Sequence, residues 1–426
     1  MNERRDERPE PTGKRVAATG NDKIVLAEEA LERPRVRPAD THGLGHRPLP
    51  PLSLYVHVPW CVRKCPYCDF NSHQAGREIP EQAYLAALQA DLEQALPLVW
   101  GRQVISIFIG GGTPSLLSGK AVDTMLASLR ACLNVLPDAE ITLEANPGTA
   151  EAARFQSYAD SGVNRISLGI QSFDDEALRA LGRIHDAAQA RAAIEMAQRA
   201  FERVNLDVMY ALPGQTLDAL RQDLNTAMAF GTGHLSVYHL TLEPNTVFAK
   251  YPPALPDEDL AARMHEHIID ATARGGWEQY EVSAYARTGQ RSIHNQNYWT
   301  FGDYLGIGPG AHGKLSFHDR ILRQARNRMP ESWMKHCMQR DGSHIAEDRV
   351  VPPSDLPFEF MLNALRLKEG VDTALFSAHT GLPITVVLPQ LRKLEARGLL
   401  DLGAGRMRAT ARGWTYLNDV LHEFVD

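Results

Sequence analysis

The sequence predicts an α/β fold in which parallel strands alternate with helices, followed by a smaller C-terminal domain. From Leu52 onward, short apolar runs rich in β-branched residues end in glycine, proline or polar residues, as buried parallel strands do. Helical patterns separate these runs, and the alternation repeats at least six times. Such a chain closes into a barrel or an incomplete barrel.

The individual elements follow from these patterns in chain order. Predicted strands cover residues 53–58, 104–110, 140–145, 165–170, 204–212 and 235–242. Helical periodicity follows the first strand at 81–96, the second at 121–133 and the fifth at 216–230. The sequence therefore predicts βα units arranged around one sheet.

Four regions are expected. Residues 1–48 are rich in Arg, Glu, Pro and Gly and predict a flexible tail, although 24–32 could form a short helix. Residues 49–285 form the barrel, and 286–350 form an irregular, aromatic accessory region that contains HNQNYW and GIGPGAHG. Two helices and a small hairpin in 351–426 predict a winged-helix-like domain, for which a structural cap is favoured over nucleic-acid binding. Its basic residues are Arg392, Lys393, Arg397, Arg406, Arg408 and Arg412.

Composition narrows the class of protein. The 45 Lys and Arg residues are outnumbered by 52 Asp and Glu, so the formal net charge of −7 does not favour nucleic acid as a partner. The start of the chain has no apolar stretch typical of a secretory signal. Three of only five cysteines fall within eight positions, which predicts a metal site in a reducing compartment. We therefore expect a cytoplasmic protein.

The cysteine loop is the most informative stretch, YVHVPWCVRKCPYCDF at residues 55–70. The strand breaks at Pro59, so Cys61, Cys65 and Cys68 lie at its C-terminal end, the face on which βα barrels place their chemistry. Three thiolates at this spacing can wrap an iron–sulfur cluster. A four-iron cluster normally takes four cysteines, so one iron would stay open to another ligand. The alternative is a structural Cys₃His zinc site that includes His73.

This loop resembles the cluster loop of the radical S-adenosylmethionine (radical SAM) family, and the C-x3-C-x2-C spacing with Tyr67 inside it is highly specific. The resemblance implies a [4Fe-4S] cluster on Cys61, Cys65 and Cys68, and a partial (βα)6 TIM-like barrel. It also implies that the amine and carboxylate of S-adenosylmethionine chelate the open iron, and that an electron donor reduces the cluster. Tyr67 is assigned to the same cofactor site.

Polar residues at successive strand ends predict the rest of this site. Each alone could be a buried polar group paired with a neighbour, but together they favour a shared ligand. Glu144 and Asp207 suit ribose hydroxyls or an amine as acceptors, and Arg183 suits a carboxylate. The resemblance, to the coproporphyrinogen dehydrogenase-like branch, covers about residues 50–425 and implies these cofactor contacts: Tyr55, Gly111, Gly112, Thr113, Glu144, Gln171, Arg183 and Asp207.

Two features separate the members of this branch. The oxygen-independent coproporphyrinogen III dehydrogenases carry a further cysteine two positions after the third, where this chain has Phe70. The HemW-type haem chaperones carry an H-N-x-x-Y-W segment, here His294 to Trp299. The chain is therefore more similar to the chaperones, which implies haem as a cofactor and haem-accepting proteins as partners, with peripheral contact to membrane haemoproteins as a further expectation. Whether it turns over S-adenosylmethionine as an enzyme stays open.

A haem ligand is expected among the histidines. His294 in HNQNYW offers an imidazole for iron, beside aromatic residues that can cover a porphyrin face. The alternative is that His294 and Trp299 only pack the barrel against the next region. His57, His239 and His312 are further candidates. The glycines at 306, 308 and 310 lack the context of a dinucleotide-binding motif and predict a loop.

Overall fold

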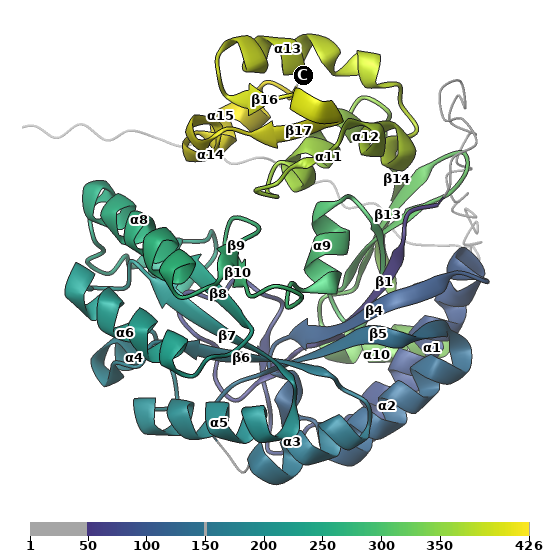
Figure 1. The fold of residues 1–426 in the computed structure, drawn as a ribbon. Helices are drawn as coiled ribbons and strands as arrows, with labels where there is room; N and C mark the ends of the chain where they lie inside the picture. The colour runs from purple at the N-terminus through teal and green to yellow at the C-terminus, as the bar shows by residue number, and fades with distance from the viewer. Residues whose placement is uncertain (1–48, 149–150, 426) are drawn as a thin grey trace, which may run out of the picture. The chain divides into compact units, whose positions relative to one another are not determined.

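The computed structural model describes residues 49–148 and 151–425, so the predicted tail and its short helix lie outside the described residues. Six parallel strands form neighbouring pairs in one sheet, which confirms the predicted βα barrel (Figure 1). They are β1 (Leu52–Val58), β4 (Gln103–Gly111), β5 (Asn134–Ala145), β6 (Arg165–Gln171), β7 (Arg203–Tyr210) and β8 (His234–His239). Two short strands, β2 (Trp60–Cys61) and β3 (His73–Gln74), pair with each other inside the cysteine loop region.

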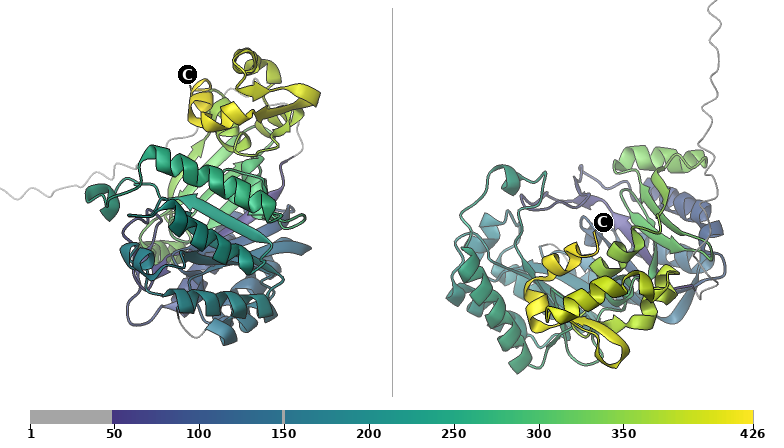
Figure 2. Two further views of the ribbon diagram at one scale, coloured as in Figure 1. Left: turned by 60° about the vertical axis from the view of Figure 1, so that its left-hand side comes forward. Right: turned by 90° about the horizontal axis from the view of Figure 1, so that it is seen from above.

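Helices connect the strands and cover one face of the sheet (Figures 1 and 2). Side-chain caps start several of them, because a serine, threonine or aspartate accepts a free N–H of the first turn, as Ser118, Asp186 and Thr216 do. No helix within the described ranges is long and apolar enough to cross a membrane. The helices are α1 (Glu81–Val99), α2 (Gly119–Cys132), α3 (Glu151–Asp160), α4 (Asp175–Ala180), α5 (Ala187–Ala200), α6 (Leu217–Ala229), α7 (Val247–Lys250) and α8 (Glu258–Arg274).

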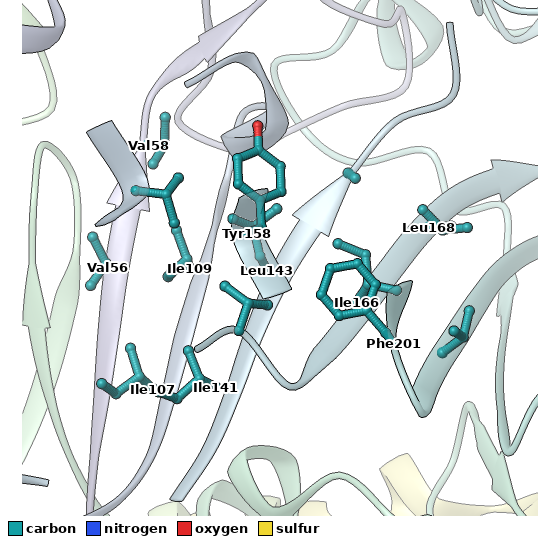
Figure 3. Close-up of a cluster of buried hydrophobic side chains, with 14 of the residues drawn as sticks. Val56, Val58, Ile107, Ile109, Ile141, Leu143, Tyr158, Ile166, Leu168 and Phe201 are labelled. Carbon is teal, nitrogen blue, oxygen red and sulfur yellow. The ribbon is translucent and has the colours of Figure 1, made fainter. Parts of the chain in front are cut away.

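The strands alternate apolar and polar side chains, because successive residues point to opposite faces of a sheet. The apolar set packs beneath the helices (Figure 3). Its labelled members include Val56, Val58, Ile107, Ile109, Ile141, Leu143, Ile166 and Leu168. The residues between them face the other way and are largely polar, among them Ser106, Glu140, Glu144, Arg165, Ser167 and Asp207. The inner face of the barrel therefore carries the polar side chains that can bind a ligand, whereas the outer face carries the apolar side chains that pack against the helices.

The accessory region is not irregular, contrary to the sequence prediction. Strand β11 (Asp303–Ile307) adds to the sheet parallel to β1, and β12 (His312–Ser316), β13 (Ile321–Arg326) and β14 (Ile345–Val350) follow in antiparallel order. Its aromatic motif forms helix α9 (Ile293–Trp299), and α10 (Pro330–Gln339) packs on α1. These strands carry buried charges, such as the Lys314–Asp303 ion pair at 2.9 Å, and so lack the continuous apolar runs that identified the others.

At the other edge of the sheet, β10 (Ala284–Ala286) pairs with β8 and β9 (Glu278–Gln279) with β10. The C-terminal region has its own hydrophobic core and a small antiparallel sheet in the order β15-β17-β16. The β16–β17 pair is the hairpin that the winged-helix-like prediction requires. The elements are α11 (Leu356–Ala364), β15 (Val371–Asp372), α12 (Thr373–Thr380), α13 (Leu388–Ala396), β16 (Leu400–Asp401), β17 (Arg406–Ala409), α14 (Ala411–Thr415) and α15 (Leu417–His422).

Candidate functional site

A cavity at the C-terminal ends of the barrel strands collects the three loop cysteines and most of the other predicted site residues. Of the predicted residues, Tyr55 and the candidate haem histidines do not line it; these histidines are His57, His239, His294 and His312. The predicted residues on its wall are Cys61, Cys65, Tyr67, Cys68, Gly111, Gly112, Thr113, Glu144, Gln171, Arg183 and Asp207. The fold therefore brings together side chains that lie up to about 150 positions apart in the chain.

The three thiols are free, and each meets a polar partner from the surrounding wall. Thr113 Oγ1 donates to Cys61 Sγ at 3.4 Å, and Arg183 Nη1 donates to Cys65 Sγ at 3.7 Å. Cys68 Sγ lies 3.8 Å from Ser72 Oγ. Burial raises the pKa of the Cys61 and Cys68 thiols, so a bound cation is needed to hold them as thiolates at neutral pH.

The zinc alternative receives no geometric support. Among the residues that the structure describes, no three His, Cys, Asp or Glu side chains converge closely enough to hold a single metal ion. His73 is not on the cavity wall, and its Nε2 lies 3.3 Å from Asn71 Oδ1. An iron–sulfur cluster binds each thiolate at a different iron, so its ligands do not have to meet at one point. The donor set on this wall fits a cluster better than an ion.

Glycine is required at the end of β4 because the chain packs closely against itself there. Gly111 has φ +116°, and a Cβ placed there would lie 2.6 Å from Cε1 of His57. At Gly112 a Cβ would lie 2.6 Å from the carbonyl oxygen of Trp60. Both contacts are closer than real Cβ atoms come, so glycine lets the end of β4 lie flat against β1 and the start of the cysteine loop. The N–H of Gly111 is left to donate to Glu144 Oε2 at 3.1 Å.

Two carboxyl groups face this cavity from β5 and β7. Burial, and then the nearby Asp207, raises the pKa of Glu144 to about 8, so Glu144 carries a proton at neutral pH and can donate as well as accept a hydrogen bond. Burial also raises the pKa of Asp207, although its carboxylate accepts from Ser167 Oγ at 3.0 Å and Asn205 Nδ2 at 2.8 Å. The pair offers both kinds of partner to a polar ligand.

Arg183 lines the cavity, and not all of its guanidinium donors have a hydrogen-bond partner among the described residues. Its Nη2 donates to Asn146 Oδ1 at 2.5 Å and to the Gly169 carbonyl at 2.8 Å. Its Nε is buried and has no hydrogen-bond partner among the described residues. Burial would lower the pKa of Arg183, but Tyr67 and Cys65 outweigh it and raise the pKa. An anionic group such as a carboxylate would satisfy this cation, so the wall fits S-adenosylmethionine beside the cluster.

A second cavity adjoins the first and has a volume of about 570 Å³, within the range of small-molecule sites. The two cavities share Phe70, Gly111 and Glu144. Tyr55 lies here, with its hydroxyl 2.9 Å from His57 Nδ1, and so does His294. The rest of the wall combines the aromatic side chains of Phe108, Tyr298, Trp299 and Tyr304 with His57, Asp69, Asn71, Asn295, Gly310, His312 and Arg328.

The candidate haem histidines differ in their environments. His294 is 8% exposed, its Nδ1 lies 3.1 Å from Ser106 Oγ, and burial lowers its pKa to about 4, so it is neutral at physiological pH. Both ring nitrogens of His57 have hydrogen-bond partners: Nδ1 lies near the Tyr55 hydroxyl, and Nε2 lies near the Asn71 carbonyl oxygen. His312 lines the second cavity, whereas His239 does not. His57 also lines this cavity with a buried ring whose pKa burial lowers to about 4, but of the two only His294 has a ring nitrogen, Nε2, that no described group bonds.

Sequence reasoning missed several residues of both cavities. Asn146 bonds Thr113 and Arg183, and Ser167 and Asn205 support Asp207. The signal for Ser167 and Asn205 was the polar–apolar alternation within β6 and β7, which marks every second residue as inward-facing, whereas Asn146 follows the end of β5. The aromatic residue Phe108, between Ile107 and Ile109 on β4, could have been found in the same way.

Comparisons with known proteins agree with this arrangement. Residues 55–227 match the Radical SAM superfamily and 351–416 match the HemN C-terminal domain. Heme chaperone HemW of Escherichia coli (strain K12) is 48% identical over 379 residues, covering 88% of this chain and 99% of that protein. The mitochondrial radical S-adenosyl methionine domain-containing protein 1 of Bos taurus is 36% identical over 409 residues, covering 91% of each.

Among solved structures, coproporphyrinogen III oxidase (HemN) from Escherichia coli aligns with a TM-score of 0.76 at 23% identity, covering 90% of this chain and 92% of that chain. This likeness establishes the fold. Together with the cysteine-lined cavity and the full-length relatives, it leads to one conclusion. The chain belongs to the HemW family within the radical SAM superfamily.

Proposed function

We propose that this protein is a haem chaperone that holds a [4Fe-4S] cluster, S-adenosylmethionine and haem, and delivers haem to acceptor proteins. One observation carries the proposal: a cavity lined by three thiols adjoins an aromatic cavity lined by a buried histidine, and the two share Phe70, Gly111 and Glu144. Relatives that span the described chain bear the name heme chaperone HemW, which supports the same assignment.

The first cavity is assigned to the cluster and S-adenosylmethionine. Cys61, Cys65 and Cys68 hold the cluster, which supplies one electron to the sulfonium when both are bound. Arg183 offers its unpartnered Nε to the methionyl carboxylate, and the carboxyl groups of Glu144 and Asp207 bond the amine or ribose. The remaining contacts assigned to this cofactor are Tyr67, Gly111, Gly112, Thr113 and Gln171.

The second cavity is assigned to haem. Its aromatic side chains suit a flat apolar ring, and its volume suits a ligand of this size class. His294 would supply an imidazole nitrogen to the haem iron, because it is neutral and no described group bonds its Nε2. Tyr55 lines this cavity and not the first one, so we assign it to the haem side rather than to the S-adenosylmethionine contacts.

The partners follow from this chemistry. Haem-accepting proteins, including membrane haemoproteins contacted at the periphery, receive the cargo, and an electron donor reduces the cluster. The free cysteines support a cytoplasmic location. In the C-terminal region, several basic residues pair with carboxylates, as Lys393 and Arg397 do with Glu423 at 2.6 Å, which reduces the positive charge offered to nucleic acid there.

The alternative function is oxygen-independent coproporphyrinogen III dehydrogenation, which would use the same first cavity. One sample tests both functions: anaerobic reconstitution, iron analysis, haem titration at the Soret band, and incubation with coproporphyrinogen III, S-adenosylmethionine and a chemical reductant for the cluster. We expect stoichiometric haem uptake without formation of a decarboxylated porphyrinogen. Product formation would overturn the chaperone assignment, as would the absence of haem uptake.

Variants locate the two ligands in their cavities. Cys61→Ala should remove the broad cluster absorption after reconstitution, because one of three ligands is lost, whereas Cys132→Ala should keep it, because Cys132 is outside the cavity. His294→Ala should weaken haem binding and leave the iron content unchanged. An unchanged haem affinity in His294→Ala would remove the ligand assignment.

A further inference from the structure

Helix α9, which carries His294, is held inside the barrel by a buried carboxylate from a distant strand. Glu140 on β5 accepts hydrogen bonds from the Ser292 hydroxyl at 3.2 Å, the Ile293 N–H at 3.1 Å and the His294 N–H at 3.0 Å. These groups start the helix, where backbone N–H groups have no partner within the helix itself. The polar inner face of the barrel therefore fixes where α9 begins.

Glu140 is itself held by two arginines of the neighbouring strands. Arg203 Nη1 lies 2.9 Å and Arg165 Nε 4.0 Å from its Oε2, and Glu140 is 1% exposed. A buried carboxylate with two cations and three hydrogen-bond donors has no freedom to move. Figure 1 shows α9 on the face of the sheet opposite α2 and α3, which agrees with an anchor on the inner face.

The ring of His294 is oriented by a short relay of hydroxyl groups. Its Nδ1 lies 3.1 Å from Ser106 Oγ, and Ser106 Oγ donates to Ser53 Oγ at 2.7 Å. Asn297, one turn further along α9, donates to the same Ser53 Oγ at 2.9 Å. Because the Ser106 hydrogen points to Ser53, its oxygen faces the ring as an acceptor, and the proton of the neutral ring sits on Nδ1. The lone pair is then on Nε2.

We propose that Ser106 is a positioning residue that fixes the tautomer of His294, so that Nε2 is presented to an iron-bearing ligand in the second cavity. This inference rests on the proposed function, because it concerns the histidine assigned to haem. A hydrogen bond to the far nitrogen of a metal-binding histidine orients the ring and makes it a stronger ligand, and its loss commonly lowers metal affinity tenfold or more. Glu140 fixes the start of helix α9, and the orientation of the His294 ring depends on the position of this helix.

The test compares Ser106→Ala with the full-length wild-type chain, using ferric haem as the probe. Ser106→Ala should bind haem about tenfold more weakly, with an altered Soret band, an altered electron paramagnetic resonance signal and a shifted haem reduction potential. The matched control is Ser161→Ala, which removes another buried serine hydroxyl, one that donates to the Ser157 carbonyl outside both cavities. This control should leave haem affinity and spectra unchanged.

A second measurement needs no haem. Nitrogen-15 NMR of the histidines in the wild-type apo chain should show Nδ1 of His294 protonated and Nε2 unprotonated, and Ser106→Ala should shift this balance. An Nε2-protonated ring in the wild type would overturn the inference, as would haem spectra in Ser106→Ala identical to those of Ser161→Ala. Unchanged haem affinity in His294→Ala would overturn the proposed ligand and the inference together. A loss in His294→Ala without any change in Ser106→Ala would overturn the inference alone.

Discussion

Replacing Gly111 by alanine tests the packing that brings β4 against the cysteine loop. The methyl group would meet the His57 ring at 2.6 Å, in a backbone conformation with φ +116° that L-residues rarely adopt. The unfavourable conformation costs about 1–3 kcal/mol, and forcing a methyl group into a filled site costs about 1–3 kcal/mol more. Gly111→Ala should therefore lower the free energy of unfolding by about 2–6 kcal/mol.

Gly214→Ala is the matched control, because Gly214 also has a positive φ, +68°, but no heavy atom lies within 4 Å of an added Cβ. Gly214→Ala should lower the free energy of unfolding only by the cost of the unfavourable backbone conformation, about 1–2 kcal/mol. Urea denaturation of the apo chains measures both values, provided that the slope with denaturant is unchanged. Equal losses in the two variants would show that the contact with His57 is not what excludes a side chain at Gly111.

Three further predictions concern other parts of the fold. Because burial raises the pKa of Glu144 to about 8, the folded chain keeps a proton that the unfolded carboxyl releases near 4.5, so the wild type loses stability as pH rises through this interval. The stability advantage of Glu144→Gln should therefore grow between about pH 5 and about pH 8.5 in urea titrations, and a constant difference would contradict the assignment. Ile107→Ala, at a fully buried site on β4, should lower the unfolding free energy by about 2–5 kcal/mol, whereas truncation of the exposed Val62 should have little effect. Asn71→Ala removes the hydrogen bonds of 2.9 and 2.8 Å that the Asn71 side chain donates to the carbonyls of Pro309 and Arg328. The variant should retain less reconstituted iron after dilution than the wild type. Full retention of iron would show that the cysteine loop does not need these two hydrogen bonds.

The barrel could be predicted from the sequence because its strands carry uninterrupted apolar signals on the face that packs against the helices. The first cavity could be predicted for a related reason, since the C-terminal ends of parallel strands meet on one side of the sheet. Residues such as Glu144 and Asp207, far apart in the chain, were therefore expected to lie together. The structure places them on one wall.

The accessory region could not be predicted in this way, because its strands bury charges that pair only after folding. Asp303 binds Lys314 and Arg102, and Arg326 binds Asp91 on α1. From the sequence alone, each of these charged residues is predicted to lie at the surface, because its ion-pair partner is not known. The role of Glu140 was hidden for the same reason, since its partners on α9 follow more than 150 positions later.

The seven-residue length of helix α9 has a consequence for the order in which the molecule assembles. Helices this short do not persist alone in water, so α9 needs its contacts with the barrel in order to form. Those contacts lie on β5, whose arginine partners come from β6 and β7, and such long-range contacts form slowly. The wall that bears His294 is thus completed only after the central strands have paired, so the imidazole of His294 takes its place only once these long-range contacts have formed.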